Sequence, residues 1–357
     1  MKSNRKIKIL LLIILGIFCA FSPIITTNLN SEFSTGVDLD KENVKISKVW
    51  GKVHIDDANP SMNWSVAKND EICTGNGTYS DPYVIEDLVI NGGGSGDCIL
   101  IENSNVYFRI ENCTVYNSEI YTDIENWWYN LWNHFAGIRL SNVNNSLLID
   151  NDCYSNNDGI HVDGFNNTIS GNTANNNING SGISVGGYNN IVAGNTANNN
   201  DFPGILLSGY NSTVSGNIAM NNSWAGIGIA LMSGFYNNVS GNTAAIQLFY
   251  SDYNTISGNT GVGIALLASN YNTISRNTAS WRIILDDSDY NIVSGNDACW
   301  EERGDCEGNV FSDNNGPCPK GDDFPVELIV LISVISGGAV IGIAAFLLIR
   351  RKRKRIE

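Results

Sequence analysis

The strongest constraint on the fold is a short phrase that recurs through the middle of the chain. It reads YNTISGNT at 253–260, and its other copies end in the same asparagine. Clear copies place it at Asn172, Asn195, Asn217, Asn242, Asn259, Asn277 and Asn296, with looser relatives at Asn112, Asn151 and Asn314. The clear copies are 17 to 25 residues apart. Such a period indicates a repeat architecture rather than a single globular core.

A second phrase lies between the repeated asparagines. It joins Gly-Ile to an alternating run, as in GIHV at 159–162, GISV at 182–185 and GIAL at 263–266. Two short alternating segments per repeat, separated by Gly and Asn turns, predict β-strands. No helical stretch follows the strands and leucine is scarce inside, which disfavours a leucine-rich repeat. The pattern therefore predicts an all-β solenoid of stacked coils.

The repeated asparagine has a physical role in such a stack. Equivalent positions of successive coils lie about 4.8 Å apart. An inward asparagine at a bend can hydrogen-bond the asparagines above and below it, and it tolerates left-handed backbone angles. We therefore predict that the nine asparagines from Asn112 to Asn296 form a ladder. The nearby Ile and Val residues are expected to fill the interior.

A tyrosine precedes many copies of the phrase and predicts a second column. The residues are Tyr188, Tyr210, Tyr253, Tyr271 and Tyr290. Two interpretations stay open for this column, structural stacking and a sugar-binding face, and stacking is favoured.

The repeats resemble a known family. They look like right-handed parallel β-helix proteins, in particular the NosD-type or carbohydrate-binding and sugar-hydrolase repeats of bacterial and archaeal surface proteins. GNGTYSDPYVIEDLVING at 75–92 resembles the lead-in to the first coil. The resemblance covers about 75–315 and implies a β-helix over 92–318 after an N-terminal cap and lead-in over 51–91. Lyases, hydrolases, epimerases, adhesins and spacers share this fold, so the function stays open.

The two ends of the chain predict a membrane protein. Basic residues and an apolar run indicate a signal peptide or signal anchor over 1–27, followed by a linker over 28–50. A linker at 319–327 leads into a 22-residue apolar segment at 328–349, long enough for a transmembrane helix. The basic tail at 350–357 stays in the cytoplasm. The β-helix is thus expected in the extracellular or periplasmic space, tethered to the cell membrane by a single pass.

The part of the chain between the basic ends is acidic and carries seven cysteines and nine sequons. Between the basic ends, 11 Lys and Arg face 35 Asp and Glu, a net charge of −24, which excludes nucleic acid as a partner. Disulfide bonds near both ends of the repeats are expected outside the cell. Their cysteines are Cys73, Cys98, Cys113, Cys153, Cys299, Cys306 and Cys318. Sequons of a predicted glycoprotein occur at Asn63, Asn76, Asn112, Asn144, Asn166, Asn179, Asn211, Asn221 and Asn238.

Catalytic candidates are few. NNDGIHV at 156–162 resembles the polygalacturonase signature NTDGID, with Asp158 at its first aspartate and His161 at its second. The later Asp-Asp pair and the GHG and RIK elements of that family are missing. Asp158 and His161 are therefore weak catalytic candidates, because the repeat itself explains most of the match.

An aromatic insertion at 121–136 breaks the repeat. Trp127, Trp128 and Trp132 either pack against the side of the β-helix, which is favoured, or form a platform for sugar rings.

Metals and cofactors receive little support. Asp286, Asp287 and Asp289 are weak Ca²⁺ candidates in a late turn. Copper, which a NosD-type role would imply, lacks a ligand pattern because the chain has three histidines. No cofactor is expected.

The favoured function is non-catalytic. The protein is expected either to bind an envelope polysaccharide or a cell-envelope protein, or to act as a rigid stalk. The alternative is a polysaccharide lyase, hydrolase or epimerase, and a copper-related periplasmic role is less favoured. A charged cluster on one face, near 122–163, would favour the enzyme.

Overall fold

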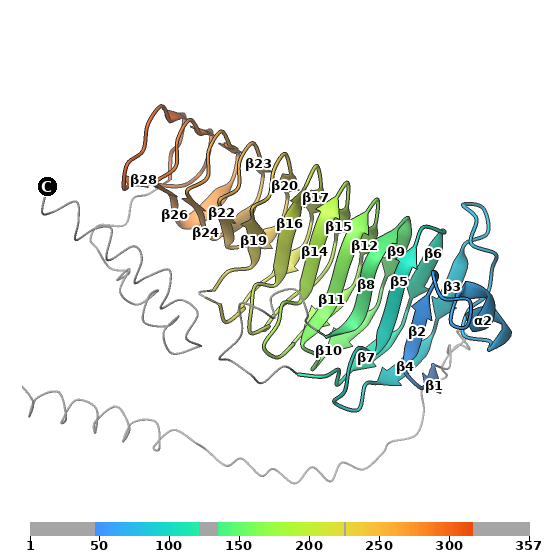
Figure 1. Cartoon of the computed structure of the whole chain (residues 1–357). Coiled ribbons are helices and arrows are strands. Elements are labelled where there is room, and N and C mark those ends of the chain that lie inside the picture. The colour runs from blue at the N-terminus through green and yellow to red at the C-terminus, as the bar shows by residue number, and fades with distance from the viewer. Residues whose placement is uncertain (1–46, 121–134, 225, 317–357) are drawn as a thin grey trace, which may run out of the picture. The chain divides into compact units, whose positions relative to one another are not determined.

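The described chain is a parallel β-helix. The computed structural model describes residues 47–120, 135–224 and 226–316. The chain winds through successive coils, and strands pair in parallel with the matching strands of neighbouring coils (Figure 1). The all-β solenoid expected from the repeat is confirmed for these residues. The one helix among them is α2 (Trp64–Asn69).

Several predicted segments lie outside the described residues. They are the signal or anchor at 1–27, most of the aromatic insertion, and the linker, membrane segment and tail at 319–327, 328–349 and 350–357. Within the described ranges, no helix combines the length and the apolar character needed to cross a membrane.

The strands of the successive coils form three parallel sheets. The 13-stranded sheet holds β2 (Val53–Asp56), β5 (Ile99–Ser104), β8 (Ala136–Asn144), β11 (Asp158–Phe165), β14 (Ile183–Tyr188), β16 (Ile205–Tyr210), β18 (Ile218–Ala219), β19 (Ile229–Met232), β21 (Thr243–Ala244), β22 (Ile246–Phe249), β24 (Thr260–Leu267), β26 (Thr278–Asp286) and β28 (Trp300–Arg303). The 11-stranded sheet holds β3 (Tyr83–Glu86), β6 (Phe108–Glu111), β9 (Ser146–Ile149), β12 (Thr168–Ser170), β15 (Ile191–Ala193), β17 (Thr213–Ser215), β20 (Asn238–Ser240), β23 (Thr255–Ser257), β25 (Thr273–Ser275), β27 (Ile292–Ser294) and β29 (Val310–Ser312). The five-stranded sheet holds β1 (Lys48–Trp50), β4 (Leu88–Asn91), β7 (Thr114–Tyr116), β10 (Asp152–Tyr154) and β13 (Thr173–Asn175).

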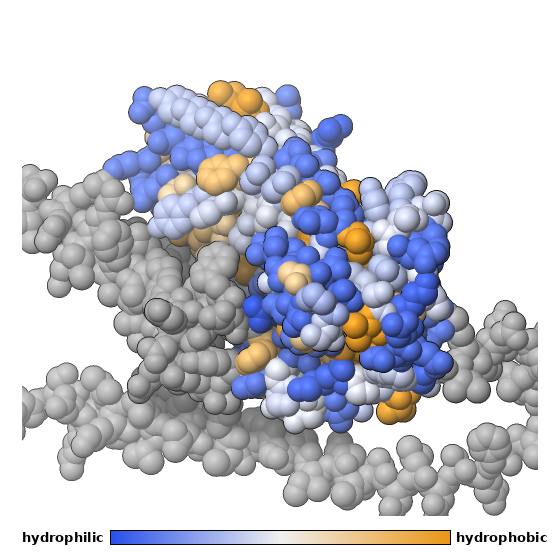
Figure 2. All heavy atoms as spheres, turned by 45° about the vertical axis from the view of Figure 1, so that its right-hand side comes forward, coloured by the Kyte–Doolittle hydropathy of each residue, from blue (hydrophilic) through white to orange (hydrophobic). Residues whose placement is uncertain are grey.

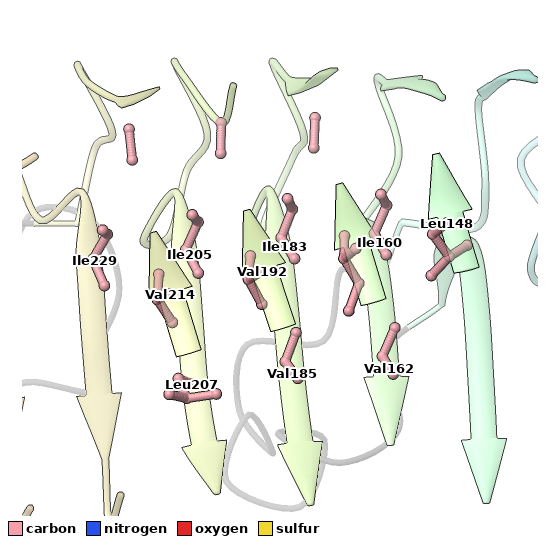
Figure 3. Packing of buried hydrophobic residues seen from close by; sticks show 14 of the residues in the cluster. Leu148, Ile160, Val162, Ile183, Val185, Val192, Ile205, Leu207, Val214 and Ile229 are labelled. Carbon is pink, nitrogen blue, oxygen red and sulfur yellow. The ribbon is translucent and has the colours of Figure 1, made fainter. Parts of the chain in front are cut away.

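The core is a set of aliphatic columns inside the coils. In β12, β15 and β17, the central Ile169, Val192 and Val214 pair in register and are fully buried. Other aliphatic side chains from the 13-stranded sheet point into the same interior (Figure 3). Each contributes about 1.5–3 kcal/mol through burial, so the stack is stabilised coil by coil.

The repeated asparagines form a buried ladder at one corner of the coils. Asn259 Oδ1 accepts hydrogen bonds from both the backbone N–H and Nδ2 of Asn242, each at 2.9 Å. Asn259 Nδ2 in turn donates to Asn277 Oδ1 and to the Val239 carbonyl oxygen, each at 2.9 Å. The same bonding pattern runs from Asn151 through Asn172, Asn195, Asn217, Asn242, Asn259 and Asn277 to Asn296 and on to Asn314.

Asn112 does not belong to this ladder, and its prediction is wrong. Its side chain is exposed, its φ is +52°, and its Nδ2 donates to Asp87 Oδ1 at 2.7 Å. The backbone N–H of Cys113 instead donates to Asn151 Oδ1 at 3.0 Å. The ladder position in this coil is therefore a cysteine, one residue further along, and Asn112 serves the left-handed bend before it.

Two more ladders occupy the other corners. One follows Asn167, Asn190, Ser212, Asn237, Asn254, Asn272, Asn291 and Asn309. The other follows Asn156, Asn177, Asn200 and Asn222. Beside the latter, a Cβ on Gly182 would lie 2.7 Å from Asn200 Nδ2 and from the Gly204 carbonyl oxygen. This close approach explains the glycine of the Gly-Ile phrase.

The third ladder ends where the coils become shorter. After Asn242 the spacing of the repeated asparagine falls to between 17 and 19 residues. The longer strand β24 now pairs with β21 at Thr260 and with β22 from Ile264 onward. One continuous strand thus replaces two short strands and the corner that joined them.

The predicted tyrosine stacking is present, in two groups. Tyr188 stacks on Phe165 and Tyr210, with ring centroids 4.8 and 5.1 Å apart. The second group is a row of four rings, in which the centroids of successive rings lie 5.0 to 5.2 Å apart. Its members are Tyr236, Tyr253, Tyr271 and Tyr290. The second group holds the left-handed position that Asn166 and its equivalents occupy in earlier coils. Ring stacking, at about 0.5–1.5 kcal/mol per pair, offsets that backbone strain.

An aromatic cluster covers the first coils near α2. Asn63 caps this helix, and Trp64 is buried against Tyr83 and Phe108, with both ring centroids at 4.8 Å. Trp64 Nε1 donates to Ser104 Oγ at 2.8 Å, so the indole is both packed and hydrogen-bonded.

The expected disulfides near the start of the repeats are not formed. Cys73, Cys98, Cys113 and Cys153 are free and buried among the core residues, and Cys306 is free and half-buried. Burial raises the pKa of Cys73 and Cys113 to about 11 and that of Cys98 to about 12, and it also raises the pKa of Cys153 well above its usual value. These thiols therefore stay protonated and unreactive inside the core. A disulfide involving Cys318 stays a prediction, because Cys318 lies outside the described residues.

Candidate active site

The outward face of the 13-stranded sheet changes character along its length. Register places His161 of β11 between Arg139 of β8 and Ser184 of β14, followed by Leu206 of β16 and Ala230 of β19. Charged side chains thus gather over β5, β8 and β11, whereas small and apolar side chains follow. Acid–base chemistry is best served by the charged end of this face.

A carboxylate–imidazole pair lies at the entrance to β11. Asp158 is the first residue of the strand, and its Oδ1 accepts a hydrogen bond of 2.7 Å from the Ser181 N–H of the next coil. Its Oδ2 lies 3.2 Å from His161 Nδ1. The Asp158 side chain is 3% exposed and the His161 side chain 16%. The neighbouring coil therefore fixes the carboxylate, which in turn orients the imidazole and leaves Nε2 for another partner.

A second carboxylate and a cation lie beside this pair. Asp97 Oδ1 accepts a hydrogen bond of 2.7 Å from the Ala136 N–H, and Asp97 Oδ2 lies 3.9 Å from Arg139 Nη1. Burial raises the pKa of Asp97, although the Ala136 N–H, Arg139 and His161 lower it in part. Arg139 Nε is buried without a hydrogen-bond partner among the described residues. An unsatisfied donor beside a desolvated carboxyl group is typical of a site that awaits a ligand.

Asp158 and His161 were foreseen, whereas Asp97 and the role of Arg139 were missed. The sequence did carry a signal for them. Asp97-Cys-Ile-Leu-Ile-Glu102 has the pattern of Asp158-Gly-Ile-His-Val-Asp163, and both segments align through Ile138 of β8. The repeat register thus brings both aspartates to the same edge of the sheet, with the coil of β8 between them.

The other predicted sites do not come together in this way. Trp127, Trp128 and Trp132 lie outside the described residues. Asp287 and Asp289 accept backbone hydrogen bonds from Asp305 at 2.9 Å and Glu307 at 2.7 Å, and so act as rungs to the next coil. In the described part of the chain, no three His, Cys, Asp or Glu residues are grouped so as to hold a metal ion, and this holds for the turn of Asp286 too.

Sequence comparison agrees with the fold. Residues 97–261 match a family model described as a right handed beta helix region, a stretch that contains the whole charged cluster. The chain therefore contains a right-handed β-helix region. No curated protein sequence matches it.

Solved structures with similar coils include three proteins of polysaccharide and phage biology. The periplasmic alginate epimerase AlgG is 13% identical, with 74% of this chain and 84% of that chain covered and a TM-score of 0.40. The enzymatically active domain of the bacteriophage CBA120 tailspike protein 2 is 12% identical, with 73% and 42% covered and a TM-score of 0.40. The A-module of the Azotobacter vinelandii mannuronan C-5 epimerase AlgE6 is 12% identical, with 67% and 86% covered and a TM-score of 0.30. These likenesses concern the coiled fold and carry no argument about substrate.

Proposed function

We propose that the protein hydrolyses a neutral polysaccharide at the cluster formed by Asp97, Arg139, Asp158 and His161. The observation that carries this proposal is the contact of 3.2 Å between Asp158 Oδ2 and His161 Nδ1. It is the arrangement in which a carboxylate orients an imidazole for proton transfer. The raised pKa of Asp97 supplies the second group that such chemistry needs.

The roles follow from the two environments. Desolvation raises the pKa of Asp97, so its carboxyl group keeps a proton to a higher pH than an ordinary aspartate. In the proposed reaction the protonated carboxyl group gives that proton to the glycosidic oxygen as the C–O bond breaks. His161 Nε2 takes a proton from the water whose oxygen attacks the anomeric carbon, and Asp158 stabilises the imidazolium that forms. Arg139, whose side chain is 20% exposed, donates a hydrogen bond from its guanidinium group to a sugar hydroxyl and so binds the sugar.

The surrounding charge favours a neutral substrate. On this part of the sheet, one arginine, Arg139, accompanies four carboxylate side chains, those of Asp97, Glu102, Asp158 and Asp163. The part of the chain between the basic ends has an excess of carboxylates as well. Hydrophilic residues dominate the face shown in Figure 2, with apolar residues in small separate groups. A polyanionic chain would be repelled at long range, whereas carboxylates readily accept hydrogen bonds from sugar hydroxyls.

Activity on a panel of polymers tests this function. The full-length protein is incubated with galactomannan, a soluble β-glucan, polygalacturonate and alginate, and new reducing ends are measured across pH. We expect new ends from a neutral polymer, with a rate that falls as the pH rises through the pKa of Asp97, because the proton donor is then lost. That alkaline limb should lie above the range of an ordinary aspartate. New ends from the polyanions alone would contradict the assignment.

Binding without cleavage is the second candidate, and the burial of the carboxylates favours it. The Asp97 and Asp158 side chains are 5% and 3% exposed, and structural ion-pair networks also contain such buried carboxylates with shifted pKa values. In that case the same panel would show retention of a polymer and no new chain ends at any pH.

We also propose that the protein is anchored at the cell surface. The resemblance of its repeats to NosD-type surface proteins and the apolar segment at 328–349 support a single-pass anchor with the β-helix outside. Protease added to intact cells should then digest the β-helix and leave a tag fused after the tail at 350–357. Complete protection of the β-helix would overturn this placement.

A further inference from the structure

A group of aromatic rings continues the edge on which the charged cluster lies. Phe202 lies in the turn before β16, and Trp224 lies in the turn before β19. Their ring centroids are 6.1 Å apart, and Trp224 is 5.7 Å from Phe249 at the end of β22. All three rings are half-buried on the outside of the coils rather than among the core residues. The aliphatic core therefore does not account for them.

Backbone hydrogen bonds connect this aromatic group to the candidate active site along successive turns. Ser181 donates its N–H to Asp158 Oδ1 at 2.7 Å. The carbonyl oxygen of the preceding Gly180 accepts a hydrogen bond of 3.1 Å from the Phe202 N–H, and the Phe202 ring then faces Trp224. The turns that carry Asp158, Ser181, Phe202 and Trp224 thus follow one another along the same edge of the 13-stranded sheet.

Small side chains separate the two groups on the sheet face. Ser184 of β14 follows His161 in register, and Gly186 and Ser208 follow Asp163. From β11 to β19 there are three strand spacings, or about 14 Å at roughly 4.8 Å each. Leu206 of β16 is a large side chain in the register of His161, and the other outward residues named here are small. We expect a linear polymer to cross the face between His161 and Trp224 at these small residues.

We propose that Trp224, with Phe202 and Phe249, forms a distal sugar-binding subsite of the Asp158–His161 site. The C–H faces of a pyranose ring are flat and apolar. Because Phe202 and Phe249 flank the Trp224 indole along the stack, the sugar packs against the outer edges of this row of rings. The inference rests on the proposed function and makes it more specific. The substrate is a neutral chain of several sugar units that runs parallel to the β-helix axis, from His161 toward the C-terminal coils.

Chain-length dependence tests this subsite. The full-length protein and its Trp224→Ala, Trp224→Phe and Trp300→Ala variants are assayed on galactomannan, on the soluble β-glucan and on their di- and trisaccharide fragments. Trp224→Ala should weaken polymer binding by about tenfold, the scale of one aromatic contact, and leave turnover of the short fragments unchanged. Trp224→Phe keeps a ring and should restore most of the affinity. Trp300 is 41% exposed and stacks on Phe311 at 3.8 Å in the last coils, so Trp300→Ala is the matched control.

The outcomes separate the two proposals. A wild-type protein that cleaves a polymer, with a Trp224→Ala variant that binds polymer equally well, would overturn the subsite and leave the proposed function intact. Equal losses in Trp224→Ala and Trp300→Ala would also overturn it, because the effect would not be local. A wild-type protein that neither retains nor cleaves any polymer would overturn the proposed function and the subsite together.

Discussion

Replacing His161 by glutamine is expected to lower the rate of polysaccharide cleavage by about 10²–10⁴-fold, the usual contribution of a general acid or base. Glutamine has a similar size and keeps hydrogen-bonding capacity, but it cannot take a proton from water. The melting temperature should change little, because the His161 side chain lies on the outward face and is 16% exposed. The initial rate of reducing-end formation is the measurement.

His54 provides a matched control on the same face. Register places it on β2, two strands from Arg139, and its Nε2 lies 2.8 Å from Glu102 Oε2. His54→Gln therefore removes another carboxylate-bound imidazole, one that is 44% exposed, from outside the proposed site. It should keep wild-type activity. Equal activity in His161→Gln and wild type would remove His161 from the mechanism.

Replacing Asn259 by alanine is expected to lower the free energy of unfolding by about 2–5 kcal/mol. The substitution leaves the Asn242 N–H, the Val239 carbonyl oxygen and Asn277 Oδ1 each without one ladder partner. All lie in the interior, where an unpaired polar group costs about 1–3 kcal/mol. Denaturant unfolding of the full-length protein, followed by circular dichroism, measures the change.

Asn238 is the matched control for this substitution. It lies on β20 with an exposed side chain, and the equivalent residue in the next coil is Thr255. Asn238→Ala should change the free energy of unfolding by about 0.5 kcal/mol or less, as for an ordinary surface site. A similar decrease in the free energy of unfolding for both substitutions would show that the ladder position of Asn259 contributes no special stability.

The sequence predicted the solenoid and one of its ladders because both depend on local repetition. Each Ser-Gly-Asn phrase fixes its own bend, so the register from Asn151 to Asn296 followed from spacing alone. The ladder through Asn254 was missed because two asparagines five residues apart look alike in sequence, and only the closed coil shows that both point inward. Asn112 was misplaced by one residue, where the repeat is too loose to align.

The cysteines and the candidate site show the limits of local reasoning. Cys98 and Cys153 were assigned to disulfides from their expected compartment, but both are free and buried in the core. Cys153 pairs in register with Val115 and Ala174, and Cys98 stands where the next coils have the glycine of the Gly-Ile phrase. Asp158 and His161 looked like a chance match to the repeat. The case for a site depends on Asp97, which is distant from both residues in sequence. Only the stacking of the coils brings Asp97 to the same edge of the sheet as Asp158. Neighbours across coils could be assigned only once the register between β5, β8 and β11 was known.

The most direct test of the central claim is to follow cleavage of a neutral polymer by the full-length protein in water enriched in heavy oxygen. Hydrolysis by Asp97 and His161 predicts new reducing ends that carry the heavy oxygen at short times, since the attacking group is water. Mass spectrometry of the fragments detects the label. Unlabelled fragments with a new carbon–carbon double bond would show elimination instead. Polymer retained without any new ends would contradict catalysis at this site.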